Sequence, residues 1–267
     1  MDQGKPRATK AEKRAVKHAA LKERRREVRK LQREKTVAKQ RAEWEALSEE
    51  DRAQRKAATK MAKEFAEERL RRVLEGDLSS LNVCIDLGFE IEIEHSDKEK
   101  RSLCKQLQLT WSVLKRAAVP IHLHVSSLGQ LSTNLIESLR VVGFASWSLD
   151  RHDEAPWNIW PRSSIVLLSP DAVDVVESFD DDKVYVIGGI VDRTVRKAVT
   201  LGRGASEQVQ TMRLPIPEYL GQTAGNVLNI DTVVQIICKH RETRDWASTL
   251  SETIPLRRKG PTPDTGI

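Results

Sequence analysis

The sequence predicts an α/β domain with a mainly parallel sheet and flanking helices, preceded by basic helices. From Leu81 onward, short apolar runs alternate with helical stretches, which is the pattern of βαβ units. Before that point, residues 10–45 lack glycine and proline and are rich in Ala, Glu, Lys, Arg and Gln. Apolar residues are too few there to form a core seam, so we expect a solvated helix.

The predicted elements follow in chain order. The first helix covers residues 10–45, and Ser48 with Asp51 resembles a capping box that opens a second helix ending near Leu74. Strands are predicted over residues 81–87, 120–125, 164–168, 183–187 and 212–214, with a further candidate at 226–230. Helices are predicted over residues 97–117, 129–142, 171–178, 231–240 and 244–250.

The charge of the chain is concentrated at its amino-terminal end. Residues 1–75 hold 24 Lys and Arg against 14 Asp and Glu, a net charge of +10, so the remainder carries −4 of the whole-chain +6. The most basic stretch includes Arg24, Arg25, Arg26 and Arg29. Such a helix could lie along a phosphate backbone, and the alternative is a solvated tail without a ligand.

The composition also bounds the class of protein. The sequence has no run of eighteen apolar residues, and its first residues lack the apolar core of a signal peptide, so we expect a soluble, intracellular protein. Cys84, Cys104 and Cys238 are odd in number and scattered, which predicts reduced, structural thiols.

A buried strand that runs into paired glycines is the strongest sign of a site. The apolar run at residues 184–187, rich in β-branched side chains, is followed by Gly188 and Gly189, and Asp192 comes three residues after Gly189. Ligands of open α/β sheets usually bind at the carboxyl ends of strands, where glycine permits close approach to the main chain. The alternative is a tight turn with a solvated Asp.

The other motifs in the sequence give weaker evidence of a functional site. His122 and His124 share one face of a strand, but a metal site needs a third convergent ligand, so we predict a hydrogen-bonded role and no metal site. Asp86-Leu87-Gly88 lacks the second glycine of a cofactor loop, and Gly202-Arg203-Gly204 indicates a loop. A nucleophile elbow and a phosphate-binding P-loop are absent from the sequence.

Five motifs occur in an order typical of one family. They are VIGGIVD at 186–192, RLPIPEY at 213–219, VLNID at 227–231, ETRDW at 242–246 and PLRRKG at 255–260. Together they resemble the tRNA position-9 N1-purine methyltransferases of the SPOUT superfamily, over residues 81–260. The resemblance implies a trefoil-knotted α/β domain, an exception to the rule against threaded chains, that binds S-adenosylmethionine and acts as a monomer on tRNA.

On this resemblance, residues 1–76 are a basic helical RNA-binding extension, 77–256 the SPOUT methyltransferase domain and 257–267 a flexible basic tail. It implies methylation of N1 of guanine-9, in the cytoplasm or the nucleus. The alternatives are adenine-9 or both purines, and, in another class, a catalytically weak tRNA-binding scaffold subunit.

The resemblance also assigns residues. Asp192 matches the proposed general base, which guanine N1 needs because it carries a proton at neutral pH. Gln106 matches a family position near the substrate pocket, and the alternative is an exposed helix glutamine. Arg140 and Arg193 suit contacts to RNA phosphate, and the alternative is that they are surface charges. The basic residues Arg24, Arg25, Arg26 and Arg29 would bind tRNA phosphates. The implied cofactor residues are Leu168, Ser169, Gly188, Gly189, Ile190, Val191, Leu214, Pro215, Ile216, Val227, Leu228 and Asn229. The chain departs from the family at Glu90, commonly Asp, and within residues 227–231.

Overall fold

The computed structural model describes residues 9–76, 80–89, 96–119, 121–191, 199–221 and 227–254. The chain forms two compact units, Met1–Ala62 and Lys63–Ile267, which divide inside helix α2 rather than at its end. The division falls there because Ala66, Leu70 and Val73, on the last turns of α2, are buried in the second unit.

The first unit contains α1 (Lys10–Glu45) and the first half of α2 (Glu49–Leu74). Both helices have the bounds that the sequence predicted to within about one residue. Ser48 lies just before α2, and its Oγ accepts a hydrogen bond from the Asp51 amide at 3.0 Å. Arg52 donates to the carbonyls of Glu45 and Leu47 at 2.7 and 3.1 Å, which fixes the corner between the helices.

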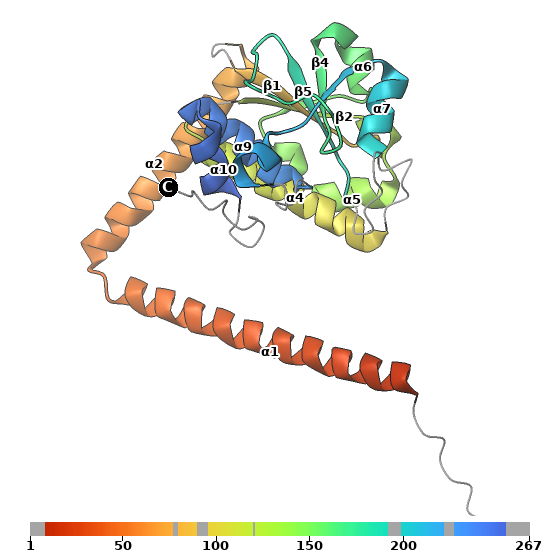
Figure 1. The fold of residues 1–267 in the computed structure, drawn as a ribbon. Coiled ribbons are helices and arrows are strands. Elements are labelled where there is room, and N and C mark those ends of the chain that lie inside the picture. Colours follow the sequence, from red (N-terminus) through yellow and green to blue (C-terminus); the bar gives the residue numbers. More distant parts are fainter. Residues whose placement is uncertain are drawn as a thin grey trace, which may run out of the picture. The chain divides into compact units, whose positions relative to one another are not determined.

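The second unit is built on a six-stranded sheet in the order β3-β2-β1-β5-β4-β6, and each pair of neighbouring strands is parallel. Helices lie on both sides of this sheet (Figure 1). The strands are β1 (Leu81–Asp86), β2 (Ile121–Ser126), β3 (Asp150–Arg151), β4 (Ile165–Leu168), β5 (Val184–Gly188) and β6 (Gln210–Met212). The helices are α4 (Asp97–Arg116), α5 (Thr133–Val141), α6 (Pro156–Ile159), α7 (Val199–Glu207), α8 (Ile216–Leu220), α9 (Ile230–Thr243) and α10 (Trp246–Thr253). The predicted α/β class with preceding basic helices is confirmed.

Alternation along the strands divides the core into two clusters. Val83 and Ile85 of β1 face the larger cluster, to which α4, α5, α9 and α10 contribute. Cys84 faces the smaller cluster, which includes Trp157 of α6 and Val209 after α7. Burial on both faces explains why these strands are near-continuous apolar runs in the sequence.

Several predicted elements were wrong. Residues 171–178 are not helical, because Val175 forms a parallel bridge with Arg213 and the Val176 amide donates to the Arg213 carbonyl at 2.9 Å. Residues 227–229 form no strand, and α9 begins at Ile230. The segment around Gly202 and Gly204 is helix α7 rather than a loop.

Gly204 has a packing role in α7. A Cβ at this position would lie 2.1 Å from Cγ2 of Thr211, so the glycine lets α7 pack against β6. Helix propensity does not predict such a close approach, because glycine ordinarily weakens a helix.

Candidate functional site

The carboxyl ends of three neighbouring strands bring the predicted cofactor segments together. Leu168 of β4 is in register with Ile187 of β5 and with Met212 of β6. The Ser169 amide then donates to the Met212 carbonyl at 2.9 Å. The segments that follow β4, β5 and β6 therefore leave the sheet side by side, at the edge where open parallel sheets bind ligands.

Gly189 lies against the exit of the neighbouring strand β1. Its amide donates to the Asp86 carbonyl at 2.7 Å. A Cβ at Gly189 would lie 2.7 Å from that carbonyl oxygen and 2.8 Å from Cδ2 of Leu87. Glycine is therefore required at position 189 by the contact between two strand exits. The constraint at Gly188 is milder, because a Cβ there would lie 3.2 Å from Cε2 of Phe89.

Asp86, whose sequence motif lacks the second glycine of a cofactor loop, organises the same edge. Its buried carboxylate accepts hydrogen bonds from the Gly88 amide at 2.9 Å and from Ser127 Oγ at 2.6 Å. Burial raises the pKa of Asp86, while these hydrogen bonds and the positive charge of Arg203 oppose the rise. The signal available in the sequence was a charged residue that ends an apolar strand two positions before a glycine.

Leu214, Pro215 and Ile216 are buried as they lead from β6 into α8. The preceding Arg213 makes a bidentate ion pair with Glu218, with N–O distances of 2.6 and 2.9 Å. Its main-chain amide also donates to the Asp174 carbonyl at 2.8 Å. The ion pair holds the two ends of the segment 213–218 together across the turn into α8, and the main-chain bond ties this segment to residue 174.

Gln106 is buried on α4, so the alternative of an exposed helix glutamine is wrong. Its Oε1 accepts a hydrogen bond from the Ile230 amide at 2.9 Å. Ile230 is the first residue of α9, whose initial amides have no partner within the helix. Gln106 thereby fixes the start of α9 next to the predicted cofactor segment that contains Val227, Leu228 and Asn229.

The side chains of the predicted cofactor segments are uncharged. Leu168, Ser169, Val191, Leu214 and Ile216 are buried, whereas Val227 is 57% exposed. Ile190 and Leu228 are half-buried, and Asn229 is exposed. Apolar side chains with main-chain polar groups are the usual lining of a site for a nucleoside-like ligand.

The remaining predicted residues lie apart from this edge or outside the description. Asp192 and Arg193 lie outside the described residues. Arg140 is exposed on α5 and pairs with Glu137 at 3.1 Å. Four exposed residues belong to α1 in the first unit: Arg24, Arg25, Arg26 and Arg29.

A cavity of about 730 Å³ lies between the last turns of α2, the outer face of α4 and the segment around Trp147. Its wall carries charges of both signs, including Glu68, Arg71 and Lys115. The cofactor segments do not line it, and we place the candidate site at the strand ends because the chain converges there.

Comparison with known proteins decides the family. The family model described as tRNA (guanine(9)-N(1))-methyltransferase TRM10/TRM10A matches residues 5–259. The chain belongs to the TRM10/TRM10A family. Among the residues that the structure describes, this family member has no helix both long and apolar enough to cross a membrane.

Curated relatives of this chain support the same family assignment. It is 30% identical over 184 residues to tRNA methyltransferase 10 homolog B of Danio rerio, covering 66% of the chain and 59% of the relative. The Bos taurus homolog B is 31% identical over 194 residues, covering 70% and 61%. The chain thus spans about three fifths of the length of these relatives. The tRNA (guanine(9)-N1)-methyltransferase of Schizosaccharomyces pombe is 27% identical, covering 82% and 77%.

Solved structures share the fold of this TRM10-family chain. The crystal structure of spTrm10(74) superposes with a TM-score of 0.61 at 27% identity, covering 66% of the chain and 95% of that structure. The complex of full-length spTrm10 with SAH gives a TM-score of 0.59 at 26% identity, covering 66% and 96%. The fold is therefore that of the SPOUT methyltransferases, as the motifs implied.

Proposed function

We propose that this chain is an S-adenosylmethionine-dependent methyltransferase that methylates N1 of guanine at position 9 of tRNA. The observation that carries the proposal is the match of residues 5–259 to a family whose description names this reaction. The S. pombe relative bears the same name, and the match covers 77% of its length.

The strand ends fit the adenosyl group of this cofactor. Residues 188–191, 214–216 and 227–229 contribute no charged side chain, and most of their apolar side chains are buried. Backbone groups of these segments, with Leu168 and Ser169, would bind the cofactor, which supplies the methyl group as a sulfonium. Gln106 is a positioning residue for this site through the Ile230 amide.

We assign the general base to Asp192, which directly follows the buried Val191. Guanine N1 carries a proton at neutral pH, so that proton leaves as the N1–methyl bond forms. A carboxylate at Asp192 would accept it. Substrate contacts are assigned to Gln106, Arg140 and Arg193, and the phosphates of tRNA to the basic helix α1.

Position 9 lies in the folded core of tRNA, so the base must be exposed before reaction, at a cost of about a few kcal/mol. Binding of the surrounding phosphates would offset that cost. We infer that the chain acts as a monomer, in the cytoplasm or the nucleus.

The test is methyl transfer from labelled S-adenosylmethionine to two tRNA transcripts that differ only in G or A at position 9. Primer extension locates the modified base. Methylation of the G9 transcript alone is expected, and methylation of the A9 transcript would indicate the adenine-specific or dual-specific alternative. Binding of both transcripts without modification would indicate the scaffold alternative.

The Asp192→Asn variant tests the base. Removing the carboxylate should slow guanine methylation by about 10²- to 10⁴-fold, the usual contribution of a positioned base, while leaving cofactor affinity within about twofold. Single-turnover rates across pH and calorimetric titration with S-adenosylhomocysteine give the two readouts. A variant as fast as wild type at every pH would remove Asp192 from this role.

A further inference from the structure

Four polar side chains meet at the β2–β3 edge of the sheet. His122 and His124 project from one face of β2, and the parallel pairing places Asp150 of β3 opposite His124. His152 follows β3 directly, and its amide donates to the Val125 carbonyl at 2.9 Å. Asp150 is therefore the third convergent group that a metal site requires, and the sequence does not reveal it.

The donor atoms of these side chains are closely spaced. His122 Nε2 lies 2.7 Å from Asp150 Oδ2, and His124 Nδ1 lies 3.6 Å from the same oxygen. His124 Nδ1 also lies 3.1 Å from Nε2 of His152. Two ligands bound tetrahedrally to one zinc ion at about 2.0–2.1 Å lie about 3.3 Å apart. The donor atoms of His122, His124 and Asp150 all lie within 4.8 Å of one another, so a small movement would bring these three onto one ion, with His152 turning in beside His124.

The surroundings of the cluster suit a bound cation. His124 Nε2 lies 3.1 Å from Asn82 Oδ1, an acceptor for the second ring N–H that orients a metal-binding histidine. Trp160 contacts the rings of His124 and His152 edge-on, with centroids at 5.0 and 5.4 Å, and forms an apolar wall. The side chain of Asp150 is 44% exposed, which leaves an entry path.

We propose that His122, His124 and Asp150, with His152 as the fourth ligand, form a structural site for a divalent transition-metal ion, with zinc as the first choice. Three imidazoles and one carboxylate favour zinc over magnesium or calcium, which prefer sets of oxygen ligands. The ion would join the two-residue edge strand β3 to β2. This site lies on strands other than those that carry the cofactor segments, and it is independent of the proposed methyl transfer.

The test uses the full chain without an added histidine tag, stripped with a chelator and dialysed. Zinc is titrated in competition with a chromophoric chelator, in the presence of excess magnesium. The variants are Asp150→Asn, which keeps the size of a half-exposed side chain, and His122→Gln. The control is His18→Gln, which removes an exposed histidine of α1.

Wild type and the His18→Gln control should each bind one zinc per chain. Both cluster variants should bind at least about 10- to 100-fold more weakly, the loss that follows even removal of an outer hydrogen-bond partner. Zinc should also raise the melting temperature of wild type and control but not of the variants, because it binds only the folded chain. Cobalt in place of zinc should give the visible absorption of a tetrahedral complex with wild type.

Circular dichroism of the metal-free variants checks that they fold. Equal zinc affinity of wild type and the folded cluster variants would overturn the proposal, as would wild type that binds no zinc at millimolar concentration. The cluster would then be held by its hydrogen bonds alone.

Discussion

Gly189 shows how one missing side chain sets the spacing of two strand exits. Gly189→Ala would place a methyl group 2.7 Å from the Asp86 carbonyl oxygen, and backbone cannot move away as a flexible side chain would. We expect a loss of about 1–3 kcal/mol in the free energy of unfolding, the usual cost of overpacking, with weaker cofactor binding. Urea denaturation and calorimetry measure the two effects.

The matched control for that prediction is Gly202→Ala. Nothing lies within 4 Å of a Cβ at Gly202, which is in α7. Alanine is the better helix former, so this variant should be unchanged or more stable by up to about 1 kcal/mol. If both alanine variants were equally stable, the close approach at Gly189 would carry no energetic weight.

Gln106 holds the start of α9 through a buried hydrogen bond. Gln106→Leu would leave the Ile230 amide without its acceptor, at an expected cost of about 1–3 kcal/mol. Gln106→Glu keeps an oxygen acceptor and should preserve more cofactor affinity than the leucine variant. Gln108→Leu on the same helix is the control, because Gln108 is only half-buried.

Affinity for S-adenosylhomocysteine separates the two roles assigned to Gln106. A role in positioning α9 predicts weaker binding by the leucine variant in the absence of tRNA. If the leucine variant lost activity with unchanged affinity for S-adenosylhomocysteine and unchanged stability, the positioning role would be wrong and the substrate contact would stand alone.

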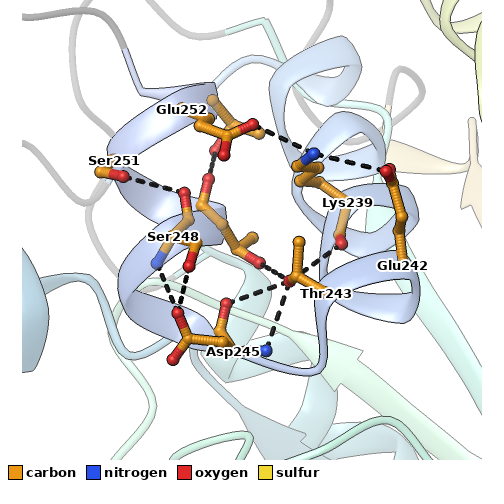
Figure 2. Close-up of polar contacts among 9 residues, drawn as sticks. Lys239, Glu242, Thr243, Asp245, Ser248, Ser251 and Glu252 are labelled. Atoms are coloured by element: carbon orange, nitrogen blue, oxygen red, sulfur yellow. Dashed lines mark hydrogen bonds and ion pairs between the residues drawn. The ribbon is translucent and has the colours of Figure 1, made fainter.

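At the scale of elements, the corner between α9 and α10 explains the ETRDW motif. Arg244 turns the chain with a φ of 55°, and Asp245 caps α10 by accepting from the Ser248 amide at 2.8 Å. Lys239 of α9 reaches Glu252 of α10 at 3.0 Å (Figure 2). The corner is therefore fixed by a cap and by polar contacts between the helices.

Inside this corner, His240 predicts a pH dependence of stability. It is buried, with its ring 4.0 Å from that of Trp246 and 5.4 Å from that of Phe179. Burial lowers the pKa of His240, and the nearby Arg244 lowers it further, against an opposing effect of Asp245. The unfolded chain, with a histidine pKa of about 6.5, therefore takes up the proton first as the pH falls.

The stability linked to His240 is present above about pH 6.5 and is lost as the pH falls below that value. His240→Phe should reduce this loss by up to about 1.4 kcal/mol per pH unit, the limit for one proton. Urea denaturation between pH 7.5 and 5 measures it, with the exposed His18→Gln as control. Parallel stability curves for wild type and His240→Phe would contradict the assignment.

The sequence predicted elements best where local pattern and tertiary contact agree. β1, β2, β4 and β5 are apolar runs buried on both faces, and each lies within about one residue of its predicted place at most boundaries. α7 was missed because its segment contains Gly202 and Gly204, and the packing of Gly204 against β6 is not encoded in helix propensity. The cluster at His122 could not be predicted, because Asp150 is 28 residues away in sequence and only the pairing of β2 with β3 brings the two side chains together.

At the scale of the molecule, charge and chemistry are assigned to separate units. Residues 1–45 hold 16 Lys and Arg against 7 Asp and Glu, a net charge of +9, which accounts for most of the basicity of the chain. The described residues from 16 to 43 are all exposed. Because a helix with so long an exposed stretch gains little from packing, we infer that this stretch serves a partner of opposite charge.

Deleting residues 1–45 should therefore weaken tRNA binding and flatten its dependence on salt, since fewer counterions are released. A sharper variant replaces Arg24, Arg25, Arg26 and Arg29 together with Gln, which keeps helix propensity and removes four charges. The slope of log affinity against log salt should fall by up to about four, about one per lost phosphate contact.

The matching variant, with Lys at the same four positions, keeps the charge and separates electrostatics from arginine geometry. If binding depends on charge alone, the lysine variant retains the wild-type affinity and slope. If the arginines make bidentate contacts to phosphate, the lysine variant binds tRNA more weakly at an unchanged slope. Filter binding between 50 and 200 mM salt gives the slopes. Unchanged affinity and slope in the glutamine variant and in the deletion would exclude α1 from tRNA binding, and the affinity would then have to come from the unit that carries the sheet.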